Sequence, residues 1–73
     1  MTISSDSIIK LCATGCNVTI YAGSYSSDSV IQFATCCKKY GGILTIKNSD
    51  KFASDTRLRI GTAGGNHVTF DFT

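Results

Sequence analysis

The chain has 73 residues, of which 42% are hydrophobic and 16% are charged, and its formal net charge is +2. This length suffices for one small domain with a marginal core, and the apolar content excludes a disordered chain. The seven lysines and arginines are scattered along the sequence, which argues against a nucleic-acid-binding surface. No apolar run reaches the ~20 residues of a transmembrane helix. We therefore expect a single domain, residues 1–73, that binds neither nucleic acid nor membrane.

The first predicted unit consists of a helix and a strand. Its helix begins at Ser4 or Ser5, whose hydroxyl can accept from the free amides of the first turn. Ile3 is expected to pack just ahead of this cap as a hydrophobic staple. Apolar residues follow at helical spacing until Gly15, where we expect the helix to end. Apolar and polar residues then alternate over 18–21, which is typical of a short half-buried strand.

The second unit repeats this order and is the longest of the three. Ser26 or Ser27 provides the cap, and an apolar stripe follows on one helical face. The helix is expected to stop at Gly41–Gly42, because glycine adopts the left-handed conformation that ends a helix at little cost. Residues 43–47 form the next predicted strand.

The third unit is weaker in its helical part. Ser54 and Asp55 repeat the start signal, but three glycines lie within 61–65. Each interior glycine costs roughly 1 kcal/mol relative to alanine in a helix, so we expect only one or two helical turns. The final strand is predicted over 68–72.

The three units, about 4–25, 26–52 and 53–73, recur at intervals of roughly 20–30 residues, which is typical of an α/β solenoid. Each strand follows a helix and leads to another helix, and such crossovers make the strands parallel and the connections right-handed. The predicted fold is therefore a short right-handed solenoid of three helix–strand repeats, with three parallel strands in one layer and helices on one face. A compact α/β sandwich with reordered strands is the structural alternative.

The alternation along the strands assigns two faces to the predicted sheet. The residues expected to face the helices are Val18, Ile20, Leu44, Ile46, Val68 and Phe70. A parallel sheet covered on both faces would have continuously hydrophobic strands, so we expect the second face to be open. This polar sheet face is our candidate interaction surface, and it consists of Thr19, Tyr21, Thr45, Lys47, Thr69 and Asp71.

The strand segments Val18–Thr19–Ile20, Leu44–Thr45–Ile46 and Val68–Thr69–Phe70 resemble those of leucine-rich-repeat-type α/β solenoids of bacterial proteins. The resemblance covers nearly the whole chain, and Asn17 and Asn66 precede two of the three strands. The consensus of that family has a ladder of leucines and an asparagine in the turn; here the strands offer Val–Thr–Ile, Leu–Thr–Ile and Val–Thr–Phe in place of the leucine ladder. The resemblance implies a binding scaffold, and it carries over no catalytic residues.

The four cysteines allow structural thiols, a disulfide or a metal site. Cys12 and Cys16 have the spacing of a zinc-ligand pair, whereas Cys36 and Cys37 are adjacent and point apart on a helix. Cys12 and Cys37 belong to apolar faces, which favours buried thiols. A small metal-binding or thiol-active protein that uses Cys12, Cys16, Cys36 and His67 is retained as an alternative, although we expect no metal and no cofactor.

No catalytic constellation is visible in the sequence, and His67 is the only histidine. We therefore predict a non-enzymatic protein-interaction or self-assembly module, which forms a homo-oligomer or binds a protein through a sheet edge or the polar sheet face. Solenoids need caps at their ends, and no cap is apparent here. A fragment of a longer solenoid is a further alternative. No signal peptide is visible, so we expect a cytoplasmic location.

Overall fold

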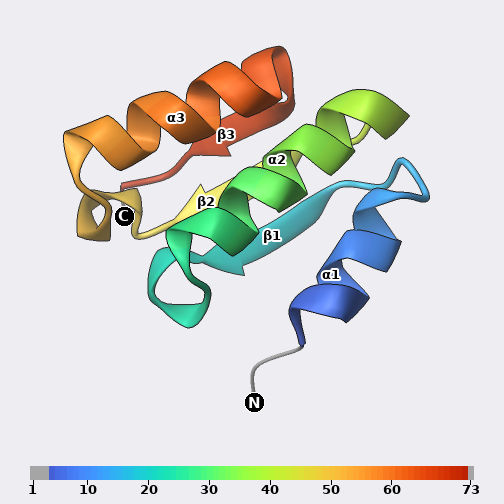
Figure 1. Cartoon of the computed structure of the whole chain (residues 1–73), viewed down its shortest axis with the longest axis horizontal. Coiled ribbons are helices and arrows are strands. Elements are labelled where there is room, and N and C mark those ends of the chain that lie inside the picture. Colours follow the sequence, from blue (N-terminus) through green and yellow to red (C-terminus); the bar gives the residue numbers. More distant parts are fainter. Residues whose placement is uncertain (1–3, 73) are drawn as a thin grey trace.

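The computed structural model describes residues 4–72 as a mixed α/β fold with three helices and a three-stranded sheet (Figure 1). The helices are α1 (Ser5–Cys12), α2 (Ser27–Tyr40) and α3 (Ser54–Gly64). The strands are β1 (Val18–Tyr21), β2 (Leu44–Lys47) and β3 (Val68–Phe70). Short 3-10 turns follow β1, β2 and α3, at η1 (Ala22–Ser24), η2 (Ser49–Lys51) and η3 (Gly65–His67).

The strands lie in sequence order, β1-β2-β3, and both pairings are parallel. Thr19 pairs with Thr45 and Thr45 with Thr69, so equivalent residues of the three units stand side by side. The helices follow the same order, with α2 packed between α1 and α3, and Figure 1 shows α1 beside the outer edge of β1. The predicted α/β class and the three parallel strands are confirmed.

Serine caps begin the first two helices, as predicted. The hydroxyl oxygens of Ser4 and Ser26 each accept from a backbone N–H three residues ahead, at 3.3 Å. The expected staple at Ile3 lies outside the described residues. The C-terminal end of α2 is also as predicted, because Gly41 adopts a left-handed φ of 86°.

The start of α3 differs from the prediction. Ala53 occupies the cap position and makes no side-chain cap bond, and Ser54 is already helical. Arg57 holds this turn instead, since its guanidinium donates to the carbonyl of Phe52 at 2.9 Å and to Ser54 Oγ at 3.3 Å.

The predicted length of α3 was also wrong, because the helix continues for 11 residues through Gly61 to Gly64. Packing overrides the low helix propensity of these glycines. A Cβ on Gly64 would lie 2.1 Å from Val68 Cγ2 and 3.1 Å from Ala34 Cβ, so only glycine allows this close approach. Gly64 therefore admits neighbouring elements, and neither it nor Gly61 ends the helix early.

Three further boundaries differ by a few residues. Helix α1 ends at Cys12, three residues before the predicted stop. Gly15 instead serves the turn that follows, with a φ of 82° and no space for a Cβ beside the Tyr40 carbonyl. Strand β2 begins at Leu44 rather than at Ile43, and β3 ends at Phe70 rather than at residue 72.

The core lies between the helices and the sheet. Of the six side chains predicted to face the helices, those of β1 and β2 are buried and those of β3 are half-buried, which confirms their orientation. Phe33 of α2 is fully buried, and its ring meets the Tyr25 ring edge to face, with the two centroids 5.2 Å apart. Within residues 4–72, no helix is both long and apolar enough to cross a membrane.

The two glycines of α3 should respond oppositely to alanine. A Cβ at Gly61 would meet Phe70 Cε2 at an ordinary 3.7 Å, so Gly61→Ala should stabilise the fold by about 0.5–1 kcal/mol through reduced unfolded-chain entropy. Gly64→Ala should destabilise it by about 1–3 kcal/mol because of the clash with Val68. Urea unfolding of both variants measures these changes, and equal shifts of the same sign would contradict the packing account.

Candidate functional site

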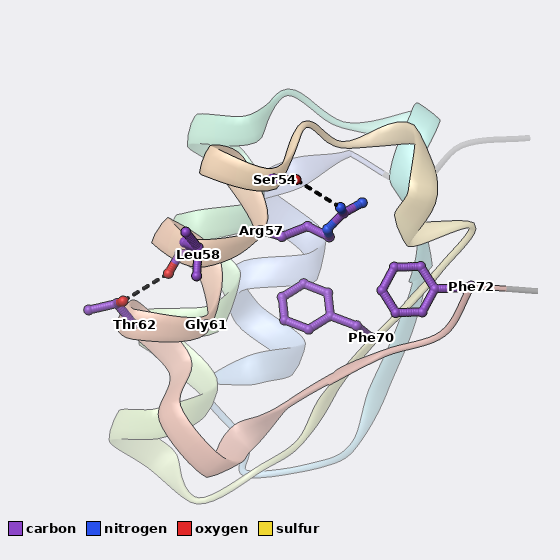
Figure 2. Close-up of a pocket in the computed structure, with 7 residues that line it drawn as sticks. All are labelled: Ser54, Arg57, Leu58, Gly61, Thr62, Phe70 and Phe72. Carbon is purple, nitrogen blue, oxygen red and sulfur yellow. Dashed lines mark hydrogen bonds between the residues drawn. The ribbon is translucent and has the colours of Figure 1, made fainter.

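A groove of about 550 Å³ runs along the outer side of the last helix–strand pair, α3 and β3 (Figure 2). We call it the end groove. It is lined by Ser54, Arg57, Leu58, Gly61, Thr62, Phe70 and Phe72.

The end groove is largely apolar. Leu58 is 69% exposed and Phe72 is 58% exposed, while Phe70 is half-buried and lies beneath α3. Gly61 widens the groove above Phe70, because it has no side chain to fill that space. Large apolar side chains gathered in one exposed hollow are typical of a protein-interaction site.

Arg57 forms the polar wall of the end groove. Its guanidinium donates to the carbonyls of Ser49 and Phe52, at 3.2 and 2.9 Å, and its central carbon lies 5.4 Å from the centroid of the Phe72 ring. Figure 2 shows this side chain extending from α3 towards that ring. A guanidinium stacked on an aromatic face contributes about 0.5–1 kcal/mol at an exposed site. Arg57 therefore links the start of α3 to the segment after β3.

Leu58 differs in exposure from the aliphatic residues at the corresponding positions of the other two helices. Each unit has an aliphatic residue three positions after its first-turn aspartate, namely Ile9, Ile31 and Leu58. Ile9 and Ile31 are half-buried and pack against the core, whereas Leu58, on the outer side of the last helix among residues 4–72, is mostly exposed. The sequence reasoning aligned the units but did not identify this groove, although comparing aligned apolar positions at the last unit would have found it.

Five of the six residues of the predicted polar sheet face stand in rows across the strands, and the sixth, Asp71, follows β3. Thr19, Thr45 and Thr69 are in register, and Tyr21 is paired with Lys47. Thr19, Tyr21 and Thr69 are exposed, and the other three members, which include Asp71, are half-buried. The structure thus brings these side chains together on the open face, and their role in binding stays a prediction.

Cys12 and Cys37 lie in the core, as predicted, and their sulfur atoms are hydrogen-bonded across 3.2 Å between α1 and α2. Burial is the main cause that raises the pKa of the Cys12 thiol to about 12, and burial also raises the pKa of Cys37. A thiol nucleophile needs a lowered pKa, so this pair is suited to packing rather than to attack on a substrate.

The residues of the alternative thiol or metal site are not brought together. The exposed Cys16 thiol donates to the Leu11 carbonyl at 3.1 Å, and the half-buried Cys36 thiol donates to the Ile9 carbonyl at 3.6 Å. His67 Nδ1 lies 2.8 Å from the Gly42 carbonyl oxygen. Among the residues that the structure describes, no three His, Cys, Asp or Glu side chains are grouped so as to hold a metal ion.

Comparisons with protein-family models, with curated proteins and with solved structures found no match for this chain. The resemblance to leucine-rich-repeat solenoids therefore stays a prediction. Any function proposed for the chain depends on its own residues, of which the end groove and the polar sheet face are the two surfaces of interest.

The buried thiols predict a loss of stability in alkali. An unfolded thiol ionises near the ordinary pKa of 9.0, whereas folded Cys12 keeps its proton up to about 12. Between these values the unfolded state releases the proton first, so rising pH favours unfolding. For Cys12 the free energy of unfolding should fall by about 2 kcal/mol between about pH 8 and about pH 10.5.

Urea unfolding under reducing conditions measures this dependence. The double variant Cys12→Ala/Cys37→Ala should show a shallower fall of the free energy of unfolding, whatever its absolute stability. Cys16→Ala is the matched control, because it removes a thiol that lies outside the buried Cys12–Cys37 pair. A double variant with an unchanged slope would show that other groups cause the alkaline loss.

Proposed function

We propose that this chain is a non-enzymatic protein-interaction or self-assembly module, built as a short right-handed solenoid of three helix–strand repeats. One observation carries the proposal. The apolar position that each of the first two units packs against the core, at Ile9 and Ile31, is 69% exposed at Leu58 in the third unit. The end groove thus presents to another protein a surface of the kind that joins the units to one another.

The solenoid part of the proposal is supported by the stacking order. Each unit contacts the next, with α1 against α2 and α2 against α3, and the strands pair in the same sequence. Helical crossovers between adjacent parallel strands are almost always right-handed. The leucine-rich-repeat resemblance is of the same kind, because those proteins stack helix–strand units and serve as binding scaffolds.

The polar sheet face is the second candidate binding surface. It is favoured by the in-register row Thr19, Thr45 and Thr69, next to the paired Tyr21 and Lys47. Tyrosine contributes large contact area with one polar group, which makes it common at protein interfaces. We keep this face as the site of an interaction distinct from that of the end groove.

A non-enzymatic role is supported by the state of the reactive side chains. His67 lies against the Gly42 carbonyl, and the two buried thiols have raised pKa values. The proposal includes a cytoplasmic location, which the four free cysteines support because thiols stay reduced there. The proposal includes no nucleic-acid partner. The chain has few cationic side chains, and one of them, Arg57, already donates to two backbone carbonyls.

Site-specific photo-cross-linking tests the proposal in extracts of the cells that express the chain. A benzophenone side chain is placed at Leu58 in the end groove, at Tyr21 on the polar sheet face, or at the exposed Gln32 of α2 as a control. We expect the products at 58 to exceed those at 32 several-fold, and mass spectrometry then identifies the cross-linked chain. Products at 21 alone would move the function to the sheet face, and equal products at all three positions would refute an interaction module.

The thiol or metal alternative is supported by one observation, the exposed Cys16 thiol. Metal analysis and thiol titration of the purified protein distinguish it from the interaction module. We expect four titratable thiols per unfolded chain and no stoichiometric metal. A stoichiometric metal whose removal lowers the melting temperature would instead favour the alternative, and Cys16→Ala should then abolish metal binding while Cys37→Ala should not.

A further inference from the structure

We propose that the end groove is the docking site for the first helix–strand unit, α1 and β1, of a second copy of this chain, so that copies associate head to tail. This inference rests on the proposed function and names the partner. The geometry points to this partner because each end of the stack exposes apolar side chains at positions that are covered inside the stack.

At the C-terminal end, the side chains that would contact a further unit are uncovered. The helix-facing residues that pair across the sheet are buried in β1 and β2, at Ile20 and Ile46, but the equivalent residue of β3, Phe70, is only half-buried. Leu58 and Phe72 beside it are mostly exposed. The third unit therefore carries the side chains of an internal unit without a neighbour.

At the N-terminal end, α1 also exposes an apolar side chain, on its other flank. Leu11 aligns with Phe33 and Ile60, each five residues after the first-turn aspartate. Phe33 and Ile60 are fully buried, whereas Leu11 is 43% exposed. α1 thus has an uncovered apolar position where α2 and α3 have a covered one.

The helix geometry places these two sets on opposite flanks. Residues two apart on a helix point about 200° apart, so Ile9 and Leu11 lie on different sides of α1. The carbonyl of Ile9 accepts from the Cys36 thiol of α2, which places Ile9 on the flank near α2 and Leu11 on the flank away from it. By the same spacing, Leu58 and Ile60 lie on different sides of α3. Leu58 of one copy and Leu11 of another are therefore the pair that continues the stack.

The sheet edges allow the same continuation. The Val18 N–H donates to the Ile43 carbonyl and the Asp71 N–H donates to the Ile46 carbonyl, at 2.9 and 2.8 Å. Because backbone groups alternate sides along a strand, those of Thr19 and Phe70 point away from β2. The outer edges of β1 and β3 can therefore pair in parallel, in the way that β1 pairs with β2. A two-fold pairing of two end grooves would leave both copies of Leu11 exposed.

Two variants test the inference. Leu58→Asp blocks the end groove and Leu11→Asp blocks the first unit, and both positions are exposed enough for the fold to tolerate them. By sedimentation velocity, wild type should grow in mass with concentration, because a head-to-tail pair keeps one free end groove and one free first unit for further copies. Each variant alone should remain at the 7.8 kDa chain mass, with circular dichroism confirming that it is folded.

The equimolar mixture of the two variants is the decisive sample. It should sediment at twice the single-chain mass, because one variant keeps an intact groove and the other keeps an intact first unit. Gln32→Asp is the matched control, since Gln32 is exposed on α2, and it should behave like wild type. A chain that carries both Leu58→Asp and Leu11→Asp keeps neither surface, so it should form no dimer.

Several outcomes would overturn the inference. If Leu11→Asp alone still associates while Leu58→Asp does not, the groove binds a second groove, and the proposed interaction function stands without the head-to-tail partner. A wild-type chain that stays monomeric at every concentration, or a mixture that does not dimerise, also refutes the second copy as partner. The proposed function itself fails only if cross-linking at 58 and at 21 does not exceed that at 32.

Discussion

The pairing of β2 with a parallel strand on each side is the constraint on which the rest of this structure depends. Leu44 and Ile46 are fully buried because neighbouring strands and the helix layer surround them. A small chain can bury few side chains so completely. Among residues 4–72, the middle helix–strand unit has a neighbour on both sides, and each of the other two units is covered by a neighbour on one side.

Much of this arrangement could be read from the sequence because the relevant signals are local. The alternation of apolar residues in each strand predicted which side chains face the helices. The serine caps of α1 and α2 and the stop at Gly41 were predicted for the same reason. Each of these depends on a few adjacent residues and on the repeated pattern.

The features that were not predicted depend on residues far apart in the sequence. The length of α3 follows from the contact of Gly64 with Val68 and Ala34, which outweighs glycine's poor helix propensity. The pairing of Cys12 with Cys37 rather than with Cys16 follows from the packing of α1 on α2. The end groove is a property of the last unit's position, because Leu58 has the same local pattern as Ile9 and Ile31.

Arg57 has one more consequence. Because its guanidinium already binds the carbonyls of Ser49 and Phe52 and lies against Phe72, one wall of the end groove is set before any partner arrives. A preorganised surface loses less side-chain entropy on association than a mobile one. In the association that we propose, the interactions that fasten the segment after β3 to α3 would also lower the entropic cost of docking, and a mutation that frees the Arg57 side chain would weaken it.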